Sequence, residues 1–359
     1  MRESIAACLK KAFDGNRLAG NEALALLRKA SPLELGHAAD AVRRRHHPEG
    51  IATYIVDRNI NYTNVCVSRC RFCAFYREAG DPEAFVLSRE ELHRKISETV
   101  SLGGTGILLQ GGHNPDLPFC YYEEMLEDIR ASFPGLHVHG FSPPEITFFS
   151  KQFSLPVADV IERLRSRGLG SIPGGGAEIL SQGVRARMAP GKATVEEWLG
   201  VMREAHRQGL RTTATMMFGS IETDEEVVDH LEAVRYLQDE TGGFTAFIPW
   251  TFQPGPETPI KESTATGIDY LKLLAVSRIF LDNFENVQAS WVTQGLKMGQ
   301  VALHFGANDI GSVMIEENVV AAAGCRNHTN EEELRHVIAQ AGFTPRKRTT
   351  LYDIFEESP

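Results

Sequence analysis

The sequence contains no hydrophobic run close to the roughly 18 residues that a membrane-spanning helix requires. Its first residues also lack the pattern of a secretory segment. Positive charge is scarce, since 37 Lys and Arg residues face 47 Asp and Glu residues, for a formal net charge of -10. The electrostatic field of a protein with this net charge repels phosphate groups. The short basic runs 43–45 and 346–348 are typical of the solvated ends of helices or strands. We therefore expect a cytoplasmic protein with no membrane and no nucleic-acid partner.

Paired CxxC units, the usual mark of a structural zinc site, are also missing. Three of the six cysteines stand alone, and we expect Cys8, Cys120 and Cys325 to be small buried hydrophobic residues. The other three, Cys66, Cys70 and Cys73, form a CxxxCxxC run. Three thiols in one loop cannot all pair as disulfides, and thiolates this close indicate a soft-metal site, most often an iron-sulfur cluster. A four-iron cluster held by three cysteines leaves one iron open to a ligand.

Low-complexity linkers are absent too, and 359 residues with 42% hydrophobic composition can bury a large core. Strand-like runs alternate with amphipathic helical runs, which is typical of a parallel sheet wrapped by helices. The expected strands are 54–59, 106–110, 136–141, 169–172, 212–218, 245–251, 287–291 and 310–314. Capping boxes at Ser88 with Glu91, Thr194 with Glu197 and Thr223 with Glu226 mark helix starts. The fold class predicted is α/β, a (β/α)8 TIM-type barrel with its chemistry at the carboxyl ends of the strands.

Two smaller pieces lie outside the predicted barrel. Residues 1–48 are expected to form a helical extension, and 49–325 to form the barrel. Residues 326–359 are expected to form a C-terminal helix and tail that pack on the barrel.

Glycine and polar residues gather where the expected strands end. Six such segments follow in register: 110–113, 139–144, 173–178, 216–219, 249–254 and 291–295. Glycine at one strand end is weak evidence, because most strand-to-helix turns use it for geometry alone. Six in register with a cysteine loop indicate a ligand site.

The CxxxCxxC run with an aromatic residue, Phe72, before its last cysteine resembles the signature of the radical S-adenosylmethionine (radical SAM) superfamily. The resemblance implies a radical SAM barrel with a 4Fe-4S cluster on Cys66, Cys70 and Cys73 and S-adenosyl-L-methionine on the open iron. One electron from the cluster then yields a 5′-deoxyadenosyl radical, supplied with electrons by an external reductant such as flavodoxin or ferredoxin. The cofactor contacts that the resemblance implies are Phe72, Gln110, Gly111, Gly112, Ser142, Glu178 and Arg187. His113 stands where the superfamily usually has an acid, and Glu178 and Arg187 could instead be an ordinary helix-start charge and a surface ion pair.

Longer motifs narrow the resemblance. The segments 59–66, 73–77, 171–180, 216–219 and 247–254 are similar to those of the cyclic dehypoxanthinyl futalosine synthase family, radical SAM oxidoreductases of the futalosine route to menaquinone. That family implies hydrogen abstraction from the ribose C4′ of dehypoxanthine futalosine and ring closure onto its benzoate. Aminofutalosine synthase, the deazaflavin synthase and a non-catalytic electron-transfer protein remain as alternatives.

Such a reaction needs a proton acceptor and a shaped pocket. His139, Glu145 and His113 lie near strand ends and are the candidate acceptors. An anionic benzoate needs donors or a cation, and the candidates are Arg77, Gln253, Ser142 and Thr293. The candidate aromatic walls are Trp250, Phe252 and Trp291, which could equally be barrel core.

Overall fold

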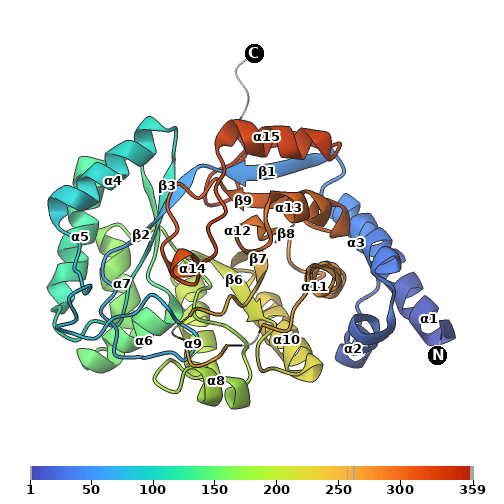
Figure 1. The fold of residues 1–359 in the computed structure, drawn as a ribbon, viewed down its shortest axis with the longest axis horizontal. Helices are drawn as coiled ribbons and strands as arrows, with labels where there is room; N and C mark the ends of the chain where they lie inside the picture. Colours follow the sequence, from blue (N-terminus) through green and yellow to red (C-terminus); the bar gives the residue numbers. More distant parts are fainter. Residues whose placement is uncertain (1, 257, 262, 356–359) are drawn as a thin grey trace.

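The computed structural model describes residues 2–256, 258–261 and 263–355 and has the predicted α/β barrel architecture (Figure 1). A seven-stranded parallel sheet, in the order β2-β3-β4-β5-β6-β7-β8, forms most of its wall. The strands are β2 Asp57–Asn61, β3 Gly106–Gln110, β4 His137–Gly140, β5 Ser171–Ile172, β6 Arg211–Phe218, β7 Phe244–Thr251 and β8 Asn286–Val287.

A three-stranded parallel sheet completes the wall, in the order β10-β1-β9. Its strands are β1 Ile51–Ile55, β9 Asp309–Ser312 and β10 Thr344–Lys347. A parallel bridge between Gln288 and Asp309 connects the end of β8 to β9, and β1 runs on into β2. The two sheets together therefore surround one interior.

Two strand predictions need correction. The expected strand 54–59 is two strands, because the pairing of β1 with β9 shifts register between Thr53 and Ile55 and the chain changes sheets at Val56. The C-terminal tail was expected only to pack on the barrel, but 344–347 form β10, a strand of its wall beside β1. The predicted C-terminal piece also includes 356–359, which lie outside the described residues.

Helices cover the outside of the wall (Figure 1). The helices that alternate with the barrel strands are α4 Arg89–Ser101, α5 Phe119–Ser132, α6 Pro143–Gln152, α7 Val157–Arg167, α8 Gln182–Met188, α9 Val195–Arg207, α10 Asp224–Thr241 and α11 Gly267–Phe280. Shorter ones follow β8 and β9: α12 Trp291–Gln294, α13 Leu296–Ala302, the 3-10 turn η1 Leu303–Phe305 and α14 Val319–Ala322. The capping boxes at Thr194 and Thr223 are confirmed, whereas at Ser88 only the hydroxyl caps, because the Glu91 carboxylate pairs with Arg94 instead.

The terminal helices pack on the barrel rather than apart from it. Helices α2 Gly20–Lys29 and α3 Pro32–His46 lie against α10 and α11, and α1 Arg2–Phe13 packs on α2 and α3, on the right of Figure 1. Gly36 of α3 allows close packing, since a Cβ there would lie 3.0 Å from the Phe305 ring. Helix α15 Glu331–Gln340 lies beside β10 and α13.

The lone cysteines only partly follow the prediction. Cys8 is buried, but Cys120 is exposed on α5 and Cys325 is half-buried, so the expectation of three buried thiols is wrong for Cys120. The amphipathic face of α5 buries Tyr122 and Leu126 and leaves position 120 toward solvent.

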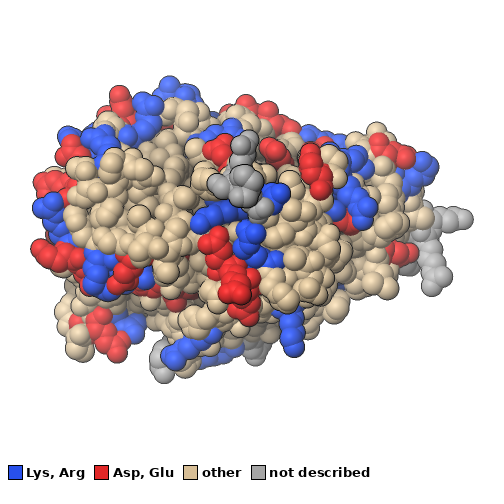
Figure 2. Space-filling view, turned by 90° about the horizontal axis from the view of Figure 1, so that it is seen from above, with Lys and Arg blue, Asp and Glu red and all other residues tan. Residues whose placement is uncertain are grey.

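Charged residues of both signs lie on the described surface. Figure 2 shows acidic and basic residues interspersed over one face, with no extended basic area. None of the described helices is long and apolar enough to cross a membrane.

Candidate active site

The loop that carries the three cysteines follows β2 and is held by backbone hydrogen bonds to the segment after β3, to the end of α8 and to its own later residues. The Cys66 N–H donates to the Arg77 carbonyl at 3.0 Å, and Val67 N–H donates to the His113 carbonyl at 3.0 Å. The Arg71 N–H donates to the Met188 carbonyl at 2.8 Å. The loop is therefore fixed to the β3 end and to the end of α8 rather than hanging free.

The environment of the thiols suits a cluster. Burial raises the pKa of the Cys70 thiol to about 12 and also raises that of Cys73. Thiols in such a place stay protonated unless a cation replaces the proton, and an iron-sulfur cluster does this. Among the described residues, no group of three or more His, Cys, Asp or Glu side chains is arranged around a single metal ion. A cluster differs from a single ion here, because each thiolate binds a different iron.

Two glycines at the end of β3 form a cradle for this loop. A Cβ on Gly112 would lie 2.2 Å from the Val65 carbonyl oxygen, and a Cβ on Gly111 would lie 2.4 Å from the Tyr62 ring. Backbone atoms cannot yield to such contacts, so only glycine lets β3 approach the loop this closely. The cradle, the buried thiols and the donor type together fit a 4Fe-4S cluster held by Cys66, Cys70 and Cys73.

Glu145 is buried beside Gly111 and joins several elements through hydrogen bonds. Its carboxylate accepts hydrogen bonds from Tyr62 Oη at 2.7 Å, Gly111 N at 3.0 Å and Ser142 N at 2.8 Å and Oγ at 2.6 Å. Burial raises the pKa of Glu145. Both oxygens are thus engaged in tying the β3 end to the start of α6, and the Ser142 hydroxyl is engaged with them.

Phe72, Glu178 and Lys192 gather on the other side of the cysteine loop. Lys192 Nζ donates to Glu178 Oε1 at 2.7 Å and lies 5.3 Å from the centroid of the Phe72 ring. Glu178 has a left-handed backbone with φ of 44°, which is rare for a residue with a side chain. Its Oε2 is buried without a hydrogen-bond partner. A strained residue with an unfilled acceptor beside the cluster loop suits ribose hydroxyl groups, the role predicted for Glu178.

The structure does not bring Arg187 to this group. Its half-exposed guanidinium donates to the carbonyls of Gly183 at 3.2 Å and Ile221 at 3.3 Å. Its neighbour Arg185 is buried and donates to the Gly176 carbonyl at 3.0 Å and the Ala177 carbonyl at 2.7 Å. On α8 a step of two residues moves a side chain to the far side of the helix, so the helical phase turns Arg187 outward.

His113 lies behind the cysteine loop. Its Nδ1 is 2.7 Å from Ser68 Oγ, and its ring stacks on Phe148 with centroids 5.0 Å apart. Burial lowers its pKa to about 3, so it is neutral near pH 7. It does not line the interior cavity described next.

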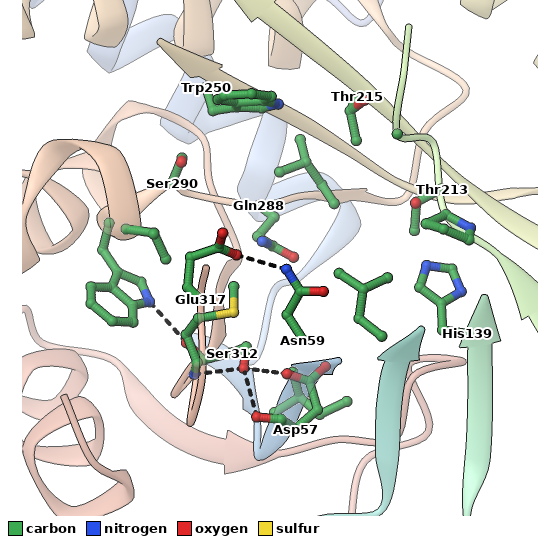
Figure 3. A pocket seen from close by; sticks show the side chains of 18 of the residues that line it. Asp57, Asn59, His139, Thr213, Thr215, Trp250, Gln288, Ser290, Ser312 and Glu317 are labelled. Atoms are coloured by element: carbon green, nitrogen blue, oxygen red, sulfur yellow. Dashed lines mark hydrogen bonds between the residues drawn. The ribbon is translucent and has the colours of Figure 1, made fainter. Parts of the chain in front are cut away.

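A cavity of about 300 Å³ lies inside the barrel (Figure 3). Each strand contributes alternate residues to the cavity lining, because side chains two positions apart on a strand share a face. Its polar lining includes Asp57, Asn59, Gln110, His139, Thr213, Thr215, Gln288, Ser290, Thr293, Ser312 and Glu317. Its larger apolar and aromatic walls are Leu108, Ile248, Trp250, Trp291, Val292, Ile310, Met314, Val319 and Val320.

Hydrogen bonds link the first strand of the barrel to the segment after β9. Asn59 Nδ2 donates to Glu317 Oε2 at 2.9 Å, while Asn59 Oδ1 is buried without a partner (Figure 3). The other Glu317 oxygen accepts from the Val319 N–H at 2.6 Å and the Val320 N–H at 3.1 Å, at the start of α14. Glu317 is therefore held at the cavity by partners from two elements.

Three of the seven predicted substrate residues line this cavity, whereas Arg77, Gln253, Ser142 and Phe252 do not. Trp250, Trp291 and Thr293 line it, and Trp291 Nε1 donates to the Ser312 carbonyl at 2.9 Å. Gln253 bonds Thr251 Oγ1 at 3.0 Å and is not in the lining, and Phe252 is buried in the core. Arg77 donates through Nη1 to the carbonyls of 74–76 and through Nε to Glu83 Oε2 at 2.8 Å, so its guanidinium is engaged beside the cysteine loop.

Several residues that the structure places at the site have only a weak signal in the sequence. Asn59, Thr213 and Thr215 are polar residues at inward positions of strands, and Gln288 directly follows β8; the period-two pattern could have found them once strand phase was known. Lys192 and Glu317 lie in loops and carry no local signal.

Comparisons with known proteins agree with this geometry. Residues 60–234 match the radical SAM superfamily, and 238–359 match the CofH/MqnC C-terminal region. The chain is 45% identical to a cyclic dehypoxanthine futalosine synthase from Halalkalibacterium halodurans, over 98% of this chain and 95% of the relative. It is 40% identical to a 5-amino-6-(D-ribitylamino)uracil--L-tyrosine 4-hydroxyphenyl transferase from Methanopyrus kandleri, over 92% of this chain and 91% of the relative.

Solved structures are similar in fold. Methylornithine synthase (PylB) superposes with a TM-score of 0.74 at 18% identity and covers 94% of this chain and 97% of its own. The hydrogenase maturase HydG of Carboxydothermus hydrogenoformans superposes with a TM-score of 0.76 at 18% identity, over 98% of this chain and 81% of its own.

Proposed function

The chain belongs to the radical SAM superfamily and to its CofH/MqnC group, and from this membership we propose that it is a cyclase of menaquinone biosynthesis. The proposed reaction removes a hydrogen atom from the ribose C4′ of dehypoxanthine futalosine and closes that carbon onto the benzoate ring. One electron and one proton then leave as the ring regains aromaticity. The observation that carries the proposal is a cavity with two tryptophan walls inside a barrel whose strand β2 lines that cavity and leads into the three-cysteine loop.

Members of the superfamily use a 4Fe-4S cluster and S-adenosyl-L-methionine, and the residues present here fit both. Cys66, Cys70 and Cys73 would hold the cluster, and the unpartnered Oε2 of Glu178 would accept hydrogen bonds from the ribose hydroxyls of S-adenosyl-L-methionine. When bound, the pair supplies a 5′-deoxyadenosyl radical that can remove a hydrogen atom from a substrate.

The protein's task in an intramolecular cyclisation is to orient its substrate. A ring closure is governed by the distance and angle between the two carbons that join, and fixed walls raise its effective concentration. Trp250 from β7 and Trp291 at the start of α12 give two broad aromatic surfaces for the aryl group. The described cavity lining contains no cysteine, so no thiol S–H stands ready to quench a carbon radical.

Polar groups at the cavity suit the sugar of such a substrate. Glu317 offers a carboxylate whose position is set by Asn59 and by the start of α14. Asn59 Oδ1 and Gln288 add an acceptor and an amide at the same side of the cavity (Figure 3). Carboxylate and amide oxygens accept hydrogen bonds from ribose hydroxyls, so we infer that the sugar lies against Asn59 and Glu317.

A second candidate is transfer of a 4-hydroxyphenyl group from tyrosine. Relatives with that name are 40–42% identical to this chain, close to the 44–45% of the named cyclases. A cavity of about 300 Å³ is near the lower end for ligand sites and suits one organic substrate better than two at once. This favours the cyclase.

The test is a product assay with substrates for each reaction in parallel. Anaerobically reconstituted protein receives S-adenosyl-L-methionine and a reductant, with either dehypoxanthine futalosine or 5-amino-6-(D-ribitylamino)uracil plus L-tyrosine. We expect cyclised product and free 5′-deoxyadenosine in equal amounts from the first mixture, and neither from a Cys70→Ala control. Turnover of the tyrosine mixture alone would overturn the cyclase in favour of the transferase. An adduct that retains the adenosyl group would instead indicate chemistry of the aminofutalosine synthase type.

A further inference from the structure

A chain of three hydrogen-bonding side chains leads out of the cavity along the barrel interior. His139 lines the cavity, and its Nδ1 lies 2.6 Å from Ser171 Oγ. The same oxygen lies 2.6 Å from His137 Nε2. His137 is partly exposed, whereas Ser171 is only 2% exposed. The chain therefore starts in the cavity, passes through a buried hydroxyl and ends at a group that solvent can reach.

Strand geometry explains this arrangement. His137 and His139 are two positions apart on β4 and so share its inner face. Ser171 pairs directly with His139 in the register of β4 and β5. Gly170 gives the ring of His137 room, since a Cβ there would lie 2.6 Å from His137 Cε1.

One pattern of protons satisfies all three groups and leaves the cavity end able to accept. If His139 carries its proton on Nδ1, that N–H donates to Ser171 Oγ, and the Ser171 hydroxyl donates to His137 Nε2. His139 Nε2 is then a free acceptor at the cavity, and His137 Nδ1 carries a proton at the solvent end. Moving each proton one step along gives the reverse pattern, which is the one left after a proton has passed from the cavity to solvent.

We propose that His139, Ser171 and His137 form a proton relay that accepts the ring proton released after cyclisation and delivers a proton to solvent. The proposal rests on the proposed function. The cyclised carbon radical first gives one electron to a one-electron acceptor of the oxidised iron-sulfur class. The ring C–H bond then breaks, its electron pair restores aromaticity, and its proton goes to His139 Nε2. The Nδ1 proton moves to Ser171, the Ser171 proton moves to His137 Nε2, and the His137 Nδ1 proton leaves.

The surroundings favour passage of the proton over its storage on His139. Burial, the neighbouring His137 and the Arg348 guanidinium hold the pKa of His139 at about 3. Arg348 comes from the C-terminal tail, donates to Asp309 on β9, and lines the same cavity as Tyr352 and Asp57. A doubly protonated His139 would be positively charged and would be repelled by that guanidinium. The Ser171 hydroxyl is therefore needed to take the Nδ1 proton away. An oxidised, cyclised ring is a strong carbon acid, and a weak neutral base suffices to deprotonate it.

The test compares Ser171→Ala with Ser171→Thr. The alanine variant breaks the chain, whereas threonine keeps the hydroxyl. We expect Ser171→Ala to lower the yield of cyclised product about 10-fold or more per 5′-deoxyadenosine formed. Without the relay the ring keeps its proton for longer, and the reductant in the assay can reduce it before it becomes aromatic. The dihydro form of the cyclised product should then accumulate, and Ser171→Thr should restore the wild-type ratio.

Thr241→Ala is the matched control. His206 Nδ1 lies 2.6 Å from Thr241 Oγ1 on the outside of the barrel, so this variant also removes a hydroxyl from a half-buried histidine. It should leave the product ratio unchanged. If wild type forms no cyclised product, the proposed function fails. If wild type cyclises and Ser171→Ala keeps the wild-type ratio, the relay is wrong while the function stands.

A second measurement does not depend on turnover. In protein labelled with 15N-histidine, the 15N shifts of His139 report which ring nitrogen carries the proton, with His139→Gln and His137→Gln variants giving the assignments. We expect the Nδ1–H form of His139 in wild type and Ser171→Thr, and a mixture of both forms in Ser171→Ala. An unchanged tautomer in Ser171→Ala would contradict the relay.

Discussion

Asn59 and Glu317 are 258 residues apart in the sequence, and Asn59 Nδ2 donates to Glu317 Oε2 at 2.9 Å at one side of the barrel cavity. The contact joins β2, which leads into the cysteine loop, to the segment before α14. It ties the elements that would hold the cofactors to one wall of the substrate cavity.

This contact gives the first prediction. Glu317→Gln removes the charge that we expect to bind the substrate's hydroxyls, while it keeps the size of the side chain. A hydrogen bond to a charged group contributes about 1.5–3 kcal/mol, so KM for dehypoxanthine futalosine should rise roughly 10- to 100-fold. Steady-state kinetics measures this rise.

Glu316→Gln is the control. Glu316 carries the same charge one residue earlier but binds Lys95 Nζ at 2.7 Å outside the cavity lining. KM should stay within about twofold of wild type, since the Glu316 carboxylate is engaged with Lys95 and does not line the cavity. Equal effects of the two substitutions would remove Glu317 from the substrate site.

The glycine cradle gives a second prediction. Gly112→Ala would place a Cβ 2.2 Å from the Val65 carbonyl and push the cysteine loop out of position. Iron and sulfide per chain after anaerobic reconstitution, and the visible absorption of the cluster, should fall strongly. Gly200→Ala on α9 meets no atom within 4 Å and should load like wild type. Full loading of Gly112→Ala would show that the loop does not need this close approach.

Trp250 gives a third prediction, which separates substrate orientation from radical formation. Trp250→Ala opens one wall of the cavity but leaves the three cysteines and Glu178 intact. The substrate radical would lose its alignment, so 5′-deoxyadenosine should still form while cyclised product falls about 10²-fold. Mass analysis of both products gives the ratio. A parallel loss of both products would place Trp250 with the cofactors instead.

Buried histidines give a fourth prediction, on acid stability. His230 on α10 is fully buried, and burial lowers its pKa to about 3 from the usual histidine value of about 6.5. Because its folded-state pKa is the lower one, the unfolded chain binds a proton between these values that the folded chain does not. Stability is therefore retained above pH 6.5 and falls as the pH drops toward 3, by about 1 kcal/mol over the first pH unit below 6.5 and by up to about 1.4 kcal/mol per unit after that.

Denaturant unfolding at several pH values measures this slope. The unfolding free energy of the His230→Gln variant should fall less steeply with pH, by the slope that one proton contributes. Its stability near pH 7 should be lower, because the Leu180 N–H loses its Nδ1 acceptor. An identical slope in both proteins would contradict the assignment of that proton to His230.

The sequence alone predicted the parts of the site that depend on local spacing. Cys66, Cys70 and Cys73 lie within one loop, so their separation along the chain already limits their separation in space. Gly111 and Gly112 follow a strand directly, and the alternation of strands and helices predicted the barrel and the edge that carries the site. These inferences need only distances of a few residues.

Tertiary structure alone decided which side chains face the interior and which partners they meet. Arg187 turns outward because of the phase of a short helix, and Glu145 is engaged because Tyr62 and Gly111 converge on it from other elements. The tail strand β10, the pairing of Lys192 with Glu178 and the bridge from His139 through Ser171 to His137 likewise join separate elements. Strand register and the closure of the wall set these contacts, and neither leaves a local pattern in the residues that they bring together.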